Sequence, residues 1–210
     1  MYAAPRSTRA VLGPIGLLCA ALAACSPQGD GTARQGGTAA ARAPSDQLAS
    51  APAVDRGRYL VEFGGCHDCH TPKLFTRDGP VPDTTRLLSG HRSDVTLPPI
   101  PAGVLGPDRW GAVGSPEFTA WGGPWGVSYA ANLTPDETGL KAWNADEFVQ
   151  TMRTGKHMGV GRAILPPMPW QQVGRLTDDD LRAVFAYLQS IKPVANAVPL
   201  PVPPPSTAAR

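Results

Sequence analysis

The sequence carries Cys66-His67-Asp68-Cys69-His70 about a third of the way along its 210 residues. Two thiols separated by two residues and followed directly by a histidine have the spacing at which haem is attached covalently to a chain. The thiols add to the two vinyl groups of the haem, and the next histidine is then held against the iron. The motif therefore predicts one haem c, bound through Cys66 and Cys69, with His70 as an axial iron ligand.

Three other interpretations of this motif explain less of it. A zinc site needs further soft ligands, and the chain has no second cysteine pair of this kind to supply them. A thioredoxin-like redox pair needs a surrounding βαβ pattern, which the flanking residues do not show. A disulfide between Cys66 and Cys69 leaves His70 without a role.

A six-coordinate haem needs a second axial ligand, for which the sequence offers several side chains. The candidates are Met152, Met158, Met168, His91 and His157. Met168 is favoured because prolines stand on both sides of it, in Pro166-Pro167-Met168-Pro169, and make the segment stiff. A stiff loop loses little entropy when a weak thioether ligand meets iron. A packing role for Met168 is the alternative.

The composition indicates a fold rich in loops and gives no sign of a nucleic-acid partner. Glycine (23) and proline (24) make up more than a fifth of the 210 residues. Charged residues are 17% of the chain, and the formal net charge is +2. Both excess positive charges, Arg6 and Arg9, lie near the N-terminus, so the rest of the chain is balanced and presents no basic surface for phosphates.

The N-terminus has the features of an export signal. Arg6 and Arg9 precede an apolar run that ends in Leu22-Ala23-Ala24-Cys25. This end resembles the lipobox of bacterial lipoproteins, so residues 1–24 are predicted to be a signal peptide and Cys25 a lipidated N-terminus. An ordinary secretory signal is the alternative. Residues 25–54, rich in small residues, are predicted to be a flexible tether.

Local signals place three helices in a domain that we expect over residues 55–192. The first is predicted from about Asp55 to Gly64, with Asp55 as its cap. The second begins at Asn144, with Glu147 completing a capping box, and ends at Gly155. The third begins at Thr177 and stops before Pro193. Residues 73–128 are predicted to be a Pro/Gly-rich coil insertion, and residues 193–210 a Pro-rich extended tail.

Several segments together resemble those of class I monohaem cytochromes c. The resemblance is strongest to the cytochrome c domains that serve periplasmic alcohol and sugar dehydrogenases of Gram-negative bacteria. The segments are Arg56-Gly57-Arg58-Tyr59-Leu60, Ala131-Asn132-Leu133-Thr134-Pro135-Asp136, Met152-Arg153-Thr154-Gly155, Pro167-Met168-Pro169-Trp170, Leu176-Thr177-Asp178-Asp179-Asp180 and Phe185-Ala186-Tyr187-Leu188. The chain departs from those dehydrogenase subunits in having one haem motif instead of three, and from compact members in the length of its insertion.

The resemblance implies a mainly α class I fold, in which the first and last helices cross. Gly57 and Tyr187 are the residues expected at the crossing. It also implies Met168 as the distal iron ligand, and a Gly79-Pro80 turn whose backbone carbonyl accepts the Nδ1 hydrogen of His70. Separately, Trp125, Tyr129 and Asn132 are candidates to donate to haem propionates, with ordinary core roles as the alternative.

Electron transfer is the function that these features favour. With His70 and Met168 both on the iron, no position is left for a substrate, and thioether sulfur favours Fe(II). We expect a lipid-anchored periplasmic electron carrier, not an enzyme, that accepts electrons from a periplasmic dehydrogenase and passes them to a downstream cytochrome or oxidase. The alternatives are a haem enzyme or sensor in which a labile Met168 opens the iron to peroxide or gas, and an anchored scaffold for another oxidoreductase.

Overall fold

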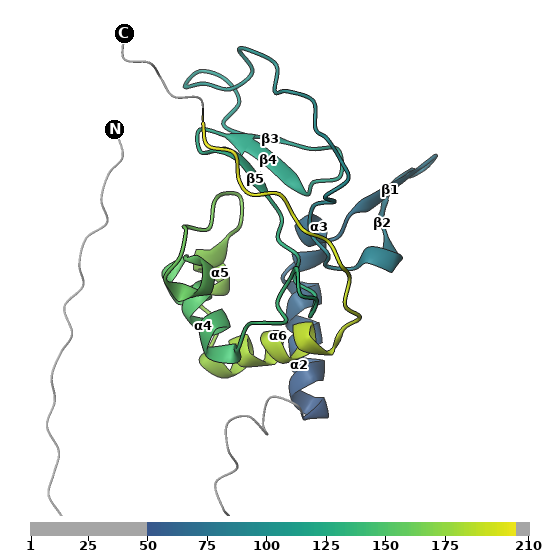
Figure 1. Cartoon of the computed structure of the whole chain (residues 1–210), viewed down its shortest axis with the longest axis vertical. Helices are drawn as coiled ribbons and strands as arrows, with labels where there is room; N and C mark the ends of the chain where they lie inside the picture. The colour runs from purple at the N-terminus through teal and green to yellow at the C-terminus, as the bar shows by residue number, and fades with distance from the viewer. Residues whose placement is uncertain (1–49, 205–210) are drawn as a thin grey trace, which may run out of the picture. The chain divides into compact units, whose positions relative to one another are not determined.

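The structure, a computed structural model, describes residues 50–204 of the chain (Figure 1). The predicted signal peptide, Cys25 and nearly all of the predicted tether lie outside these residues, as do residues 205–210. Within the described part, helices at both ends of the domain enclose a middle region that holds short strands. The helices form the core, and the middle region completes the surroundings of the Cys66–His70 motif.

Helices α2 (Ala51–Phe63) and α6 (Asp178–Ser190) cross at a point of very close backbone approach. A methyl group placed on Gly57 would come within 1.9 Å of the carbonyl oxygen of Ala183 and 2.8 Å of the Tyr187 Cβ. Only a residue without a side chain fits there, so the predicted crossing at Gly57 and Tyr187 is confirmed. Figure 1 shows the two helices passing each other at the base of the domain.

The ends of α4 (Ala145–Thr154) and the start of α6 lie where the sequence predicts them, whereas the start of α2 does not. α4 has the expected capping box of Asn144 and Glu147, and it ends at Gly155 with φ 67°. α6 is capped by the Thr177 side chain, which accepts from the backbone N–H of Asp180. α2 starts at Ala51, four residues before the predicted Asp55. Pro52 does not prevent this, because a proline in the first turn of a helix removes no intrahelical hydrogen bond.

The core lies where α2, α4 and α6 meet. Phe148 of α4 packs against Phe185 of α6 with ring centroids 5.6 Å apart. Around this pair lie buried aliphatic side chains from all three helices and from the loops before α4. They are Val61, Leu88, Leu140, Ala145, Val149, Met152, Leu181, Val184 and Leu188. Leu181, Val184 and Leu188 recur at helical spacing along α6, so one face of this helix is turned toward the core.

The middle region differs from the coil that was predicted for residues 73–128. It holds a hairpin of β1 (Lys73–Thr76) and β2 (Gly79–Pro82), the short helix η1 (Thr84–Arg86), and an antiparallel sheet in the order β3–β4–β5. The sheet consists of β3 (Val113–Gly114), β4 (Ala120–Gly123) and β5 (Gly126–Tyr129). Glycines in these strands weaken the strand signal in the sequence, and tertiary packing supplies what local propensity lacks.

The predicted Pro-rich tail packs on the domain at least as far as Val202. Val202 and Val127 of β5 exchange two backbone hydrogen bonds, of 2.8 and 2.9 Å. Asn196 is only 3% exposed, and its amide donates to the carbonyls of Ser89 and His91 at 2.7 and 2.8 Å. The packed domain therefore extends past the predicted boundary at Lys192, as the yellow segment that runs up to the sheet in Figure 1 shows.

Candidate haem site

The short helix α3 (Cys66–His70) fixes the orientation of the His70 ring. His70 is 8% exposed, and its Nδ1 lies 2.8 Å from the backbone carbonyl oxygen of Ala131. A carbonyl oxygen can only accept a hydrogen bond, so Nδ1 carries the proton and Nε2 keeps its lone pair. Burial also lowers the pKa of His70, which favours the neutral imidazole. This arrangement leaves Nε2 as the ring nitrogen that is able to coordinate a metal.

The acceptor for His70 is not the one that was predicted. Pro80 lies exposed in β2, and the carbonyl of Ala131 takes the place of the Gly79-Pro80 turn. Ala131 is held there because neighbouring backbone groups are paired: Gly90 N–H donates to the His70 carbonyl at 2.8 Å, and His91 N–H donates to Ala130 at 2.9 Å. Every residue has a backbone carbonyl, so the sequence contained no signal for this acceptor.

Lys73 closes the C-terminal end of α3. Its Nζ donates to the carbonyls of His67 and Asp68, each at 3.1 Å, and also to the carbonyl of Thr71. These are carbonyls at the C-terminal end of α3, where a cation is favourable. Burial lowers the pKa of this ammonium group. A lysine three residues after His70 was a signal for this contact that the sequence analysis did not use.

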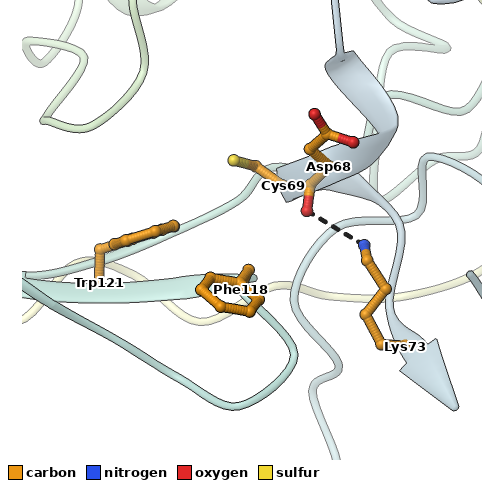
Figure 2. Close-up of a pocket in the computed structure, with 5 residues that line it drawn as sticks. All are labelled: Asp68, Cys69, Lys73, Phe118 and Trp121. Atoms are coloured by element: carbon orange, nitrogen blue, oxygen red, sulfur yellow. Dashed lines mark hydrogen bonds between the residues drawn. The ribbon is translucent and has the colours of Figure 1, made fainter. Parts of the chain in front are cut away.

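Cys66 and Cys69 are free, partly buried thiols. Burial is the largest cause of a raised pKa at both residues, so both are held as neutral thiols. A cavity of ≈ 360 Å³ lies beside Cys69 and is lined by Asp68, Cys69, Lys73, Phe118 and Trp121. In Figure 2 the Cys69 sulfur points away from the Asp68 carboxylate, toward the side where Trp121 lies.

The residues around this cavity fit a haem edge. A haem joined to Cys69 must lie next to its sulfur, and the rings of Phe118 and Trp121 offer it apolar faces. The two rings support each other, with centroids 5.8 Å apart. Trp121 Nε1 is buried and has no hydrogen-bond partner among the described residues. A buried donor without a protein partner is a reason to expect a ligand there.

Two of the predicted propionate donors are engaged elsewhere. The Asn132 amide donates to the Val194 carbonyl at 2.8 Å and to the Thr138 hydroxyl at 3.1 Å, which uses both of its hydrogens. Trp125 Nε1 donates to the Ser128 hydroxyl at 3.3 Å. For Asn132 and Trp125 the structure thus supports the structural role over the propionate role. The Tyr129 ring packs against His91, with centroids 4.9 Å apart.

Met168 lies in a braced segment directly before α5 (Trp170–Val173). It is half-buried and packs against the helical core. The carbonyl of Pro166 accepts a 2.6 Å hydrogen bond from Ser128 of β5, which ties this segment to the sheet. In Figure 1, α5 and α3 lie on opposite sides of the view, with the β3–β5 sheet above them. Met168 as the iron ligand stays a prediction.

The competing distal candidates have other surroundings. Met152 is 8% exposed in the core, and His91 is 2% exposed with its Nδ1 2.9 Å from the Thr119 hydroxyl. His157 packs edge-on against Trp143, with ring centroids 4.9 Å apart. Met158 lies in the short helix η2 (His157–Gly159), in the left-handed region with φ 52°. Met152 and His91 are thus held by packing and hydrogen bonding within the protein. Met158 is the methionine with which Met168 has to be compared as a distal ligand.

No cluster of three or more His, Cys, Asp or Glu side chains that could hold a metal ion occurs within residues 50–204. This does not favour a zinc site at the cysteine pair. None of the helices in the same range is long and apolar enough to cross a membrane.

Comparison with known proteins identifies relatives among the subunits of dehydrogenases. The fructose dehydrogenase cytochrome subunit of Gluconobacter japonicus is 28% identical over 165 residues, which is 76% of this chain and 26% of that protein. The alcohol dehydrogenase (quinone) cytochrome c subunit of Gluconobacter oxydans is 38% identical over 74 residues, 34% of this chain and 15% of that protein. The chain is similar to cytochrome c subunits of dehydrogenase complexes. This confirms the resemblance to cytochrome c domains of alcohol and sugar dehydrogenase systems.

A third relative belongs to another dehydrogenase. It is a subunit of the nicotinate dehydrogenase of Pseudomonas putida, and it is 30% identical over 151 residues, 71% of this chain and 10% of that protein. No family model matches the chain. The matched regions span about a quarter or less of the three relatives, so the chain corresponds to one part of each of these longer proteins.

Proposed function

We propose that this protein is a c-type cytochrome that carries single electrons through one covalent haem. Haem c would be attached through Cys66 and Cys69 and would supply reversible one-electron chemistry. The observation that carries the proposal is the His70 ring, whose Nδ1 donates to the Ala131 carbonyl at 2.8 Å and leaves Nε2 for iron. The similarity to cytochrome c subunits of dehydrogenases supports the same assignment.

The residues of the chain have distinct roles in this proposal. The Ala131 carbonyl fixes the tautomer of His70 and increases its basicity. Lys73 holds the carbonyls at the end of the turn that presents both thiols. Met168 would be the second axial ligand, and its thioether would favour the reduced state. Filling both axial positions excludes substrates from the iron and leaves electron exchange as the activity.

We further propose where the protein works and with what. Lipidation at Cys25 would anchor it to a membrane on the periplasmic side, with residues 25–49 as part of the tether. Its electron donor would be a periplasmic dehydrogenase, and its acceptor a downstream cytochrome or oxidase. Mass spectrometry of the mature N-terminus tests the anchor: an acylated Cys25 supports it, and an unmodified terminus contradicts it. Isolation of a dehydrogenase with the protein, followed by haem reduction on addition of that enzyme's substrate, tests the partner.

The haem assignment is tested by removing both thiols. Cys66→Ala together with Cys69→Ala should abolish the haem-staining band of the protein on a denaturing gel. The matched control is His67→Gln, which alters the residue between the two attachment sites and should keep the band. A band that survives in the double variant contradicts covalent attachment, and so does a wild-type protein that never stains when haem-attachment machinery is present.

A further inference from the structure

The β1–β2 hairpin presents apolar side chains on both of its faces, and among them Leu74, Phe75 and Val81 are 49%, 61% and 43% exposed. Leu74 and Val81 are paired on one face of the hairpin. Phe75 is paired with the exposed Pro80 on the other face. Among residues 50–204 these two strands pair only with each other, and Figure 1 shows the hairpin projecting from the domain. A two-stranded hairpin alone is at best marginally stable in water, so this clustered apolar surface indicates a partner that covers it.

The hairpin is fastened to the haem motif at its base. β1 begins at Lys73, three residues after His70, and the Lys73 Nζ donates to two backbone carbonyls of α3, each at 3.1 Å. The same side chain lines the cavity beside Cys69 (Figure 2). At the end of β2, Asp83 N–H donates to the Pro72 carbonyl at 2.8 Å. A molecule that binds the hairpin is therefore held at a fixed position beside the proposed haem edge, and electron exchange requires such closeness.

We propose that the β1–β2 hairpin is the surface to which the electron-donating dehydrogenase binds. This inference rests on the proposed function, in which such an enzyme reduces the haem, and it adds the element of this chain that the enzyme contacts. A donor that covers the hairpin lies on the Cys69 side of the haem and has no need to reach the iron. The first part of the 73–128 insertion thereby acquires a role in recognition of the donor.

The size and charge of the hairpin favour this occupant over a second copy of the chain or a membrane. β1 and β2 have four residues each. A stable dimer takes about 20–30 residues from each partner, whereas weak electron-transfer complexes bury much less surface, so the hairpin by itself fits a transient redox complex. Its tip carries Arg77 and Asp78, whose side chains are 95% and 87% exposed. These charges would enter a bilayer ahead of the apolar side chains, which disfavours insertion into a membrane.

Photo-cross-linking identifies what covers the hairpin. The photoreactive amino acid p-benzoylphenylalanine takes the place of Phe75 in the full chain, expressed in its own host. Irradiation should give a haem-stained product that contains the catalytic subunit of a dehydrogenase. The same group in place of Leu200, an exposed side chain outside the hairpin, should give no such product. A product with a second copy of this chain or with lipid overturns the inference, and so does the absence of any product from position 75.

Kinetics with the cross-linked enzyme and its substrate measure the contribution of the hairpin. Leu74→Ser and Phe75→Ser remove apolar contacts at exposed positions, so the fold and the reduction potential should stay as they are. We expect each variant to raise the KM of the dehydrogenase for this protein on the order of tenfold, with kcat nearly unchanged, because only binding is weakened. Phe75→Leu keeps an apolar side chain and should lie close to wild type. Leu200→Ser is the matched control and should leave KM unchanged.

Haem staining and reduction by dithionite separate failure of this inference from failure of the proposed function. A wild-type protein that neither stains nor is reduced contradicts the proposed function itself. Serine variants that stain, are reduced by dithionite and keep the wild-type KM contradict only the binding of the dehydrogenase to the hairpin. A rise in KM that occurs equally in Leu200→Ser also overturns the inference, because the effect would then not belong to the hairpin.

Discussion

The backbone of Gly57 lies against the carbonyl of Ala183, so that a methyl group on Gly57 would come within 1.9 Å of that oxygen. The obstacle is backbone of α6 and not the end of a flexible side chain, so it cannot rotate away. Two helices far apart in the sequence are thereby locked together next to the haem motif, because α2 leads directly into Gly64, Gly65 and Cys66. The crossing and the site are one structural unit.

Gly57→Ala should destabilise the folded protein. Alanine favours a helix over glycine by about 1 kcal/mol, but forcing the helices apart costs about 1–3 kcal/mol or more. The clash should win, and the midpoint of thermal unfolding should fall by several degrees in calorimetry or circular dichroism. Gly111→Ala is the matched control, because a methyl group there meets nothing within 4 Å and should leave the midpoint unchanged. An unshifted midpoint in Gly57→Ala would contradict the described crossing.

An ion pair beside the crossing gives a pH-dependent stability. Asp180 of α6 accepts from the guanidinium of Arg56 at 2.8 Å, and this hydrogen bond is the main cause of a lowered pKa at Asp180. A carboxyl with a lower pKa in the folded state stabilises the fold above its unfolded pKa, about 3.9, and this contribution is lost as pH falls through the folded value. Arg56 is exposed and Asp180 is only partly buried, so solvent screens the pair and its contribution to stability is small.

Asp180→Asn should therefore lower stability at pH 7, and the difference from wild type should shrink below about pH 4. Urea unfolding at a series of pH values measures this difference. Asp179→Asn removes a carboxylate from the same helix turn. It controls for the favourable interaction between a carboxylate and the positive N-terminal end of the α6 dipole. A difference from wild type that is as large at pH 3 as at pH 7 would show that Asp180 acts through something other than its charge.

The sequence predicted the helices better than the middle of the chain, for physical reasons. Asn144 with Glu147, and Thr177 before three aspartates, are local signals, because caps bond to backbone within one turn. The β3–β5 sheet depends on contacts between residues that are distant in the sequence, and its glycines give only a weak strand signal. One such contact explains Gly122, where a methyl group would come 2.2 Å from the Ile100 side chain.

Within the site, the same distinction separates what was predicted from what was missed. The spacing of the motif singles out His70, and the structure shows this ring buried with its Nδ1 on the Ala131 carbonyl, while its role as an iron ligand stays a prediction. The Ala131 acceptor has no side-chain signal and depends on a contact 61 residues away in the sequence. The sequence also does not show which polar side chains find hydrogen-bond partners within the protein. In the structure Trp125 and Asn132 have such partners, whereas the Trp121 Nε1 has none among the described residues.

Asn196 should be essential for holding the C-terminal segment in place. Its amide donates to the carbonyls of Ser89 and His91, and its side-chain oxygen accepts from Ser93 N–H at 3.0 Å. Asn196→Ala leaves these three groups unpaired, so we expect a loss of about 3 kcal/mol or more in the free energy of unfolding, from roughly 1–3 kcal/mol per group. Leu200→Ala, at a side chain that is 79% exposed, is the control and should change little. Equal stability of the two variants in urea would contradict a docked segment.

Replacing Met168 tests the distal ligand and, with it, the electron-transfer function. Histidine is a harder ligand than thioether and favours Fe(III). We expect Met168→His to keep a six-coordinate haem and to lower the reduction potential by on the order of 0.1 V, within the roughly 0.8 V that axial ligation spans. Met168→Ala should remove the far-red absorption band that marks methionine on ferric haem, and should allow the reduced protein to bind carbon monoxide.

Met158→Ala is the matched control for Met168→Ala, because Met158 is also half-buried and lies in the turn after α4. It should leave the far-red band and the potential as they are. If Met158→Ala erases the band and Met168→Ala does not, the ligand is Met158, and the left-handed backbone at that residue, φ 52°, becomes part of the ligand loop. Carbon monoxide binding by the unaltered reduced protein would instead favour a sensor or enzyme with an open iron. The hydrogen bond from Ser128 to the Pro166 carbonyl holds the Met168 segment in place, so we expect the unaltered reduced protein not to bind carbon monoxide.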